Sequence, residues 1–267
     1  MLQRILTSAV GLVIFFAALF AGEGVFTAAV SIVLLLALCE VLNAIKCGKE
    51  IFALSLASAA AVLFGLIFDN TVFVLILSVM IYMSAGVLLH TKYTYKDIYS
   101  AAFITYFITL FFGALIRLRT EFGIEAVFLV FLFAWGTDTG AYFSGKAFGK
   151  HKLIPKVSPK KTVEGAIGGV ICSVILACAY LAFLRKIIGI DYVGGASYVG
   201  MSVLAVIASV FSQIGDLTAS GIKRDCGVKD FGTILPGHGG IMDRFDSVVF
   251  ISPMVLYFFI YFNKLVG

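Results

Sequence analysis

Residues 51–89 read IFALSLASAAAVLFGLIFDNTVFVLILSVMIYMSAGVLL, two apolar runs separated only by Asp69 and Asn70. Each run is close to the roughly 20 residues that a helix needs to cross a bilayer. The pattern continues in both directions, and 61% of the 267 residues are hydrophobic whereas only 13% are charged. Soluble domains have about 45–50% apolar and about 25% charged residues. The sequence therefore predicts an all-α polytopic integral membrane protein.

Nine apolar runs are long enough to be considered as membrane helices. We expect a single membrane domain over residues 1–267, in which residues 1–120 are helices without a motif and residues 124–267 carry the catalytic helices and loops. The runs cover residues 5–21, 25–45, 51–68, 71–89, 98–116, 124–143, 166–184, 196–215 and 247–262.

The distribution of basic residues predicts the orientation. With nine helices, 15 of the 20 Lys and Arg residues lie on the side of the N-terminus and five on the opposite side. Because Lys and Arg are enriched in cytoplasmic loops, the N-terminus is expected inside. This orientation rests mainly on two long polar loops, 144–165 and 216–246. Both are expected on the cytoplasmic side, where they can form one site in a multi-pass protein of the cell (inner) membrane.

Four acidic residues lie near the predicted helix ends: Asp138, Asp216, Asp243 and Asp246. Ionisable groups at membrane depth are costly and therefore are candidates for function. Clustered carboxylates repel one another unless a cation lies between them, and hard oxygen ligands suit Mg²⁺. We therefore expect a magnesium site. The alternative is structural, with Asp243 capping a helix or pairing with Arg244 and Asp216 at a solvated helix end.

Two pairs of basic residues, Lys160–Lys161 and Lys223–Arg224, indicate phosphate binding. Neighbouring hydroxyl groups can donate hydrogen bonds to phosphate oxygens, and glycines allow backbone amides to approach an anion closely. A loop that is basic only because it faces the cytoplasm is the alternative. The neighbouring hydroxyls and glycines are those of Ser158, Thr162, Ser220, Gly239 and Gly240.

Two further polar residues are harder to interpret. His238, in the sequence PGHGG, is equally compatible with a general base, a hydrogen-bond donor to phosphate, or a turn residue. Glu40 lies in the second apolar run, where an acid more often pairs helices or sits at the interface than acts as a catalyst.

Residues 220–246 read SGIKRDCGVKDFGTILPGHGGIMDRFD, and this stretch resembles the signature of the phosphatidate cytidylyltransferase family, also called CDP-diacylglycerol synthases. The segments WGTDTGAYFSGKAFGK and SPKKTVEG are also similar to that family. The resemblance implies that CTP and phosphatidic acid give CDP-diacylglycerol and pyrophosphate. It further implies a requirement for Mg²⁺, with K⁺ assisting, and a homodimer in membrane lipid; no nucleic-acid partner is expected.

The resemblance also implies roles for individual residues. Asp216 and Asp243 match the family's metal-binding acids, and Asp138 and Asp246 are additional candidate ligands. The candidate catalytic residues are Asp216, Asp243, Lys223 and Arg224. The candidate substrate-binding residues are Lys160, Lys161, Ser158, Thr162, Ser220, Lys229, His238, Gly239, Gly240 and Arg244.

Three alternative functions fit these motifs less well. An ion-coupled transporter also places acids and glycines at membrane depth, but here the polar residues concentrate at one face. A CDP-alcohol phosphotransferase would use clustered aspartates, but its D-G-x-x-A-R repeat is absent from the sequence. A structural scaffold would not need the dense segment 216–246.

Overall fold

The computed structural model describes residues 2–188, 198–235, 237 and 239–266. Most of these residues are helical. In chain order the elements are α1 (Leu2–Phe20), α2 (Glu23–Ala44), α3 (Lys49–Ile67), α4 (Thr71–Leu88), α5 (Tyr95–Phe148), β1 (Lys152–Ile154), β2 (Ser158–Thr162), α6 (Val163–Phe183), a π-helical turn (Leu184–Ile188), α7 (Tyr198–Asp225) and α8 (Met242–Val266).

Within the described part of the chain, seven helices, α2 to α8, are long and apolar enough to cross a membrane, and α1 contributes a shorter apolar helix, Val10–Phe20. The all-α class is therefore confirmed, apart from the small hairpin of β1 and β2. The count of nine spans stays a prediction, because α5 contains two of the predicted runs. At about 1.5 Å per residue, its 54 residues would measure about 80 Å if straight, against about 30 Å for a bilayer core.

Helix α5 is interrupted at Gly123, whose φ of 85° and ψ of −170° lie outside the helical region. Glycine has no Cβ and adopts positive φ at little cost, whereas other residues are strained there. The interruption separates residues 95–122 from residues 124–148. It lies just before the start of the predicted run 124–143, so the composition located the division between two helical segments.

The chain divides into two compact units, and each unit is built from two separate stretches of the sequence. The first unit comprises Met1–Ile116 and Asp225–Arg244, and the second comprises Arg117–Arg224 and Phe245–Gly267. The segment 225–244 carries much of the motif and groups with the N-terminal helices. The single membrane domain over residues 1–267 stays a prediction.

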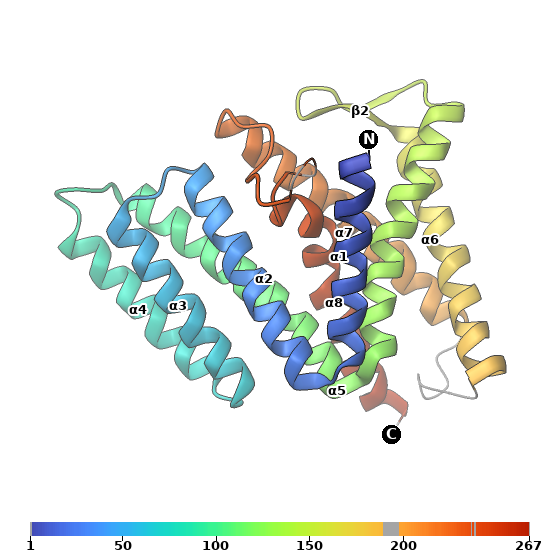
Figure 1. Ribbon diagram of the computed structural model, residues 1–267, viewed down its shortest axis with the longest axis horizontal. Helices are drawn as coiled ribbons and strands as arrows, with labels where there is room; N and C mark the ends of the chain where they lie inside the picture. The colour runs from blue at the N-terminus through green and yellow to red at the C-terminus, as the bar shows by residue number, and fades with distance from the viewer. Residues whose placement is uncertain (1, 189–197, 236, 238, 267) are drawn as a thin grey trace. The chain divides into compact units, whose positions relative to one another are not determined.

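In the first unit, α2, α3 and α4 lie side by side (Figure 1). Polar contacts join its helices in the apolar interior: the buried Tyr82 hydroxyl on α4 donates to Ser55 Oγ on α3 at 2.8 Å and lies 3.3 Å from Thr105 Oγ1 on α5. Helix α5 begins with reciprocal bonds, Thr94 N–H to Asp97 Oδ2 at 3.1 Å and Asp97 N–H to Thr94 Oγ1 at 3.2 Å. These bonds satisfy donors that a helix start leaves unpaired.

In the second unit, hydrogen bonds and small residues bring the helices together. Thr137 Oγ1 on α5 donates to Ser209 Oγ on α7 at 2.9 Å, and both residues are fully buried. The Tyr180 hydroxyl on α6 donates to the Glu125 carbonyl at 3.1 Å. The antiparallel hairpin of β1 and β2 lies at the N-terminal end of α6 (Figure 1). The second unit thus places a short polar hairpin beside apolar helices.

Candidate functional site

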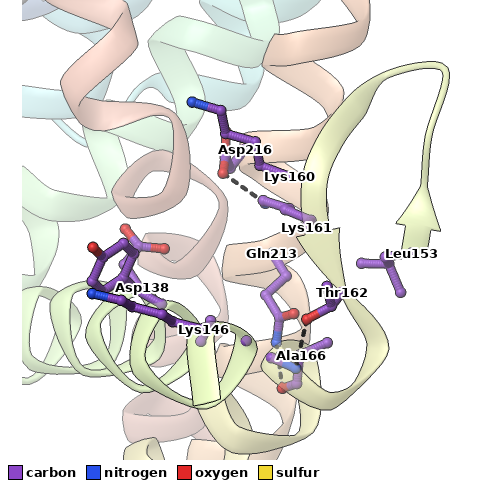
Figure 2. Close-up of a pocket in the computed structure, with 13 residues that line it drawn as sticks. Asp138, Lys146, Leu153, Lys160, Lys161, Thr162, Ala166, Gln213 and Asp216 are labelled. Carbon is purple, nitrogen blue, oxygen red and sulfur yellow. Dashed lines mark hydrogen bonds and ion pairs between the residues drawn. The ribbon is translucent and has the colours of Figure 1, made fainter. Parts of the chain in front are cut away.

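A cavity of about 420 Å³ lies in the second unit, where α5, the hairpin, α6 and α7 meet. Three lysines and two aspartates line it, so its charged side chains carry an excess of one positive charge. Figure 2 shows several of these side chains around the cavity. The lining residues are Asp138, Ala141, Tyr142, Gly145, Lys146, Leu153, Lys160, Lys161, Thr162, Gly165, Ala166, Gln213 and Asp216.

An ion pair joins β2 and α7 at the wall of the cavity. Lys161 Nζ on β2 lies 2.6 Å from Asp216 Oδ2 on α7, and the two side chains point toward each other in Figure 2. Ser220, one turn after Asp216 on α7, donates from Oγ to Asp216 Oδ1 at 3.4 Å. Both charged side chains are partly exposed, so the pair remains accessible to a ligand in the cavity.

The hairpin that carries Lys160 and Lys161 is held at both ends. Thr162 caps α6, because its Oγ1 accepts a hydrogen bond from Gly165 N–H at 3.1 Å. The Glu164 carboxylate accepts from Lys150 N–H at 3.1 Å and from His151 N–H at 3.2 Å. These contacts fix the hairpin to the start of α6 and thereby hold both lysines at the cavity.

Helix α7 is longer than predicted, because the expected helix end at residue 215 is wrong. The helix continues to Asp225, so Asp216, Ser220, Lys223 and Arg224 are helical residues rather than loop residues. Their spacing of four, seven and eight positions places them along one helix face. Hydropathy marks only the apolar part of a helix, whereas the backbone hydrogen bonds continue through its polar end.

Asp138 and Asp216 both line the cavity, and each is close enough to the other for their charges to interact. Asp246, on α8, is likewise close enough to Asp216 and Lys223. Among the described residues, no group of three or more His, Cys, Asp and Glu side chains is arranged to hold a metal ion. Mg²⁺ usually takes one or two carboxylates, with substrate phosphates and water completing its shell. Two carboxylates at the cavity are thus within the number that this ion usually takes from a protein.

Five further predicted residues lie in the first unit. Lys229, Gly239 and Arg244 line a cavity of about 380 Å³, and Gly240 and Asp243 are their neighbours in the chain. Asp243, in the first turn of α8, uses Oδ2 to accept hydrogen bonds from Phe231 N–H at 2.8 Å and Gly240 N–H at 2.9 Å. Asp243 thus has a structural role in this segment. The cavity is lined by Lys229, Asp230, Gly232, Thr233, Gly237, Gly239 and Arg244.

The structure brings most of the predicted residues into these two clusters, one within each unit. Ser158 begins β2, next to the two lysines. His238 lies outside the described residues. Sequence reasoning missed Gln213, whose Nε2 donates to the Ala166 carbonyl at 3.2 Å in the cavity wall. Its position three residues before Asp216 was the available signal. Sequence reasoning also gave no site role to Glu40, which the structure buries beside the second cavity's segment.

Cys226, the residue after the end of α7, has a poorly reactive thiol. Burial, together with the nearby Asp225 carboxylate, raises the pKa of the Cys226 thiol above its ordinary value. The thiol therefore stays protonated at neutral pH and reacts slowly.

A family model described as the cytidylyltransferase family matches residues 2–262. The chain belongs to the cytidylyltransferase family. A phosphatidate cytidylyltransferase of Staphylococcus aureus is 37% identical over 260 residues, which cover 94% of this chain and 96% of the relative. A phosphatidate cytidylyltransferase of Staphylococcus epidermidis is 35% identical over the same shares of the two chains. One of Staphylococcus saprophyticus is 41% identical over 175 residues, 66% of this chain and 64% of the relative.

This cytidylyltransferase is thus an α-helical membrane enzyme, and both clusters lie within the matched region. The family match confirms the resemblance that the segment 220–246 indicated. The lysine-lined cavity of the second unit has the charge expected for a nucleotide's phosphates.

Proposed function

We propose that this cytidylyltransferase transfers the cytidylyl group of CTP to phosphatidic acid, giving CDP-diacylglycerol and pyrophosphate. The observation that carries the proposal is the cavity in which Lys160, Lys161 and Asp216 meet. The two lysines belong to the segment SPKKTVEG, which is similar to the family, and by the same resemblance Asp216 matches one of the family's metal-binding acids. The relatives named phosphatidate cytidylyltransferase support the choice of the lipid acceptor.

In the proposed reaction, an oxygen of the lipid phosphate attacks the α-phosphorus of CTP. A new P–O bond forms, the bond from the α-phosphorus to the bridging oxygen breaks, and pyrophosphate leaves. A phosphate monoester has a second pKa of about 6, so the lipid phosphate is mostly a dianion at pH 7. It is already nucleophilic, and the reaction needs no dedicated general base.

The main barrier is the repulsion between this dianion and the triphosphate. Lys146, Lys160 and Lys161 line the cavity and would neutralise phosphate oxygens there. Asp216 holds Lys161 in place by their 2.6 Å ion pair, and a bound phosphate would compete for the same ammonium group. Lys223 and Arg224, at the end of α7, would carry part of the remaining negative charge.

The proposed metal ligands are Asp216 and Asp243, as the resemblance implies, with Asp138 and Asp246 as further candidates. A bound Mg²⁺ would supply Lewis-acid polarisation of the phosphates and additional charge neutralisation. Asp243 would contribute its carboxylate, whose Oδ2 also accepts hydrogen bonds from the Phe231 and Gly240 amides. We also propose that K⁺ assists Mg²⁺ and that the enzyme is a homodimer.

The two substrates determine where the site must open. CTP is soluble in the cytosol, whereas the acyl chains of phosphatidic acid stay in the bilayer. Polar residues at the ends of apolar helices satisfy both conditions, and the basic loops favour the cytoplasmic side. We therefore place the active site at the cytoplasmic surface of the cell membrane.

The test is pyrophosphate release by detergent-purified protein supplied with phosphatidic acid and Mg²⁺. CTP is compared with ATP, GTP and UTP, and EDTA serves as the control. Turnover that requires CTP, the lipid and the metal is the expected result. Release without lipid, or no release in detergent that keeps the protein folded, would overturn the proposal; an ion-coupled transporter would then be tested next.

A further inference from the structure

Glu40 is a buried acid that sequence analysis left without a site role. It lies in the last two turns of α2 and is only 5% exposed. Its Oε2 accepts a hydrogen bond from Met242 N–H at 3.0 Å, across 202 positions in the sequence. Met242 is the first residue of α8, so this carboxylate satisfies one of the backbone donors that a helix start leaves unpaired. A negative group at this end is also favoured by the helix dipole.

Two described positions of the segment 231–242, Gly232 and Gly240, pack their backbone directly on this carboxylate. A Cβ atom at Gly232 or at Gly240 would overlap the Glu40 carboxyl group, and the three nearest atoms at both glycines belong to Glu40. Close packing of this kind requires glycine on one side and a fixed side chain on the other. Glu40 therefore contacts the segment at three points: Gly232, Gly240 and the Met242 amide.

Asp243 binds the same segment from its own end. Its Oδ2 accepts from Phe231 N–H and Gly240 N–H, so two carboxylates, one from α2 and one from α8, fix neighbouring amides of one segment. Residues of this segment, among them Gly239, line the cavity of the first unit together with Lys229 and Arg244. A shift of Met242 or Gly240 would move Asp243 and Arg244 with it, because they are adjacent in the chain.

A buried carboxylate is expensive, and Glu40 Oε1 has no hydrogen-bond partner among the described residues. A hydrophobic residue at this position would avoid that cost but would leave the Met242 amide unpaired. The cost of burying the Glu40 carboxylate is therefore reasonable if holding the segment 231–242 in place matters more to the protein than the stability of α2.

We propose that Glu40 is a positioning residue of the cytidylyltransferase site: it sets the placement of Gly240, Asp243 and Arg244 through the start of α8. The role rests on the proposed function, since it concerns residues assigned there to metal and substrate. In this role Glu40 acts through the backbone of Gly232, Gly240 and Met242 rather than on the reacting groups.

The first test compares Glu40→Ala with Glu40→Gln. Glutamine keeps a carbonyl oxygen that can accept from the Met242 amide, whereas alanine removes it. We expect Glu40→Ala to lower kcat per folded molecule about tenfold or more, and to speed amide exchange in residues 231–243 by a similar factor. Glu40→Gln should restore most of both, within about threefold of the wild type.

The matched control is Glu23→Gln, an acid in the first turn of the same helix, which should change neither readout. A purely structural role would lower the melting temperature of Glu40→Ala but leave kcat per folded molecule and local exchange within about twofold, and that result overturns the inference. A Glu40→Gln variant as damaged as Glu40→Ala would also overturn it. If wild-type protein releases no pyrophosphate, the proposed function fails, while the exchange measurement still tests the contact.

The second test combines Gly232→Ala with Glu40→Ala. The methyl group at position 232 overlaps only Glu40 among its nearest neighbours, so Gly232→Ala should speed exchange about tenfold in the wild-type background but about twofold or less in Glu40→Ala. Equal effects in the two backgrounds would show that the packing on Glu40 does not hold the segment.

Discussion

The two cavities use different parts of the polypeptide to build a polar site. In the second unit, charged side chains project from β2, α5 and α7, and the ion pair of Lys161 and Asp216 lies at the wall. In the first unit, a glycine-containing segment presents backbone groups, and the acids Asp243 and Glu40 bind its amides. The cluster of the second unit therefore depends on charge, whereas the cluster of the first unit depends on the placement of its backbone. Substitutions should therefore have different signatures in the two units.

The largest effect is expected for Asp216→Asn. The substitution removes the charge that pairs with Lys161 and that we assign to the metal, while it keeps the size of the side chain. Pyrophosphate release should fall about a thousandfold. The control is Asp69→Asn, in the turn between α3 and α4, where φ is 58° and asparagine is tolerated. An Asp216→Asn enzyme within tenfold of the wild type would remove Asp216 from the metal site.

The second prediction, Asp243→Asn, asks whether the first unit also contributes charge. The asparagine oxygen can still accept from the Phe231 and Gly240 amides, so the segment should keep its structure. We nevertheless expect a loss of about a hundredfold or more in turnover, because the carboxylate charge is gone. Amide exchange in residues 231–243 should be unchanged. Normal turnover would leave Asp243 with only its structural role.

Lys161→Ala should give a smaller loss, about 10- to 100-fold, because one charge-assisted contact is removed while Lys146 and Lys160 remain. The loss should appear mainly as weaker apparent binding of CTP and should shrink at high salt, where the wild type itself binds more weakly. Lys92→Ala, which pairs with Glu50 in the first unit, is the matched control. A loss in kcat alone would contradict a role in binding phosphate.

The smallest effect is expected for Thr162→Ala, which removes the cap of α6. The cap is worth about 1 kcal/mol, so the melting temperature should fall by a few degrees. Turnover at 25 °C should stay within about threefold of the wild type, since Glu164 still holds the hairpin. A loss as large as that of Lys161→Ala would mean that the Thr162 hydroxyl contacts the substrate.

Much of the fold was predictable, because long apolar segments in a membrane leave few alternatives to helices. The runs 25–45, 51–68 and 71–89 agree within a few residues with α2, α3 and α4. The polar regions were less predictable. The loop expected over 144–165 contains the end of α5 and a hairpin. The loop expected over 216–246 begins with the last ten residues of α7, up to Asp225, and ends with the start of α8.

The site stays a prediction, made from the sequence as a set of residue types. Lysine pairs, acids and glycines in fixed spacing indicated phosphate and metal chemistry, and the family match supports the motif from which they were chosen. Which residues contact one another was not predictable, because contacts such as Lys161–Asp216 join positions 55 residues apart. The sequence also gave no reason to connect Glu40 with Met242.

By itself, the sequence determined the helical membrane class, which follows from composition, and indicated the family through the resemblance of its motifs. Local spacing of acids, lysines and glycines predicted the chemical character of the site. Only the tertiary structure decided that the motif residues fall into two clusters, that Asp216 pairs with Lys161, and that Glu40 binds the start of α8. The physical reason is that hydropathy and helix periodicity are local properties of the chain. Ion pairs, close glycine contacts and buried hydrogen bonds depend instead on how distant segments pack.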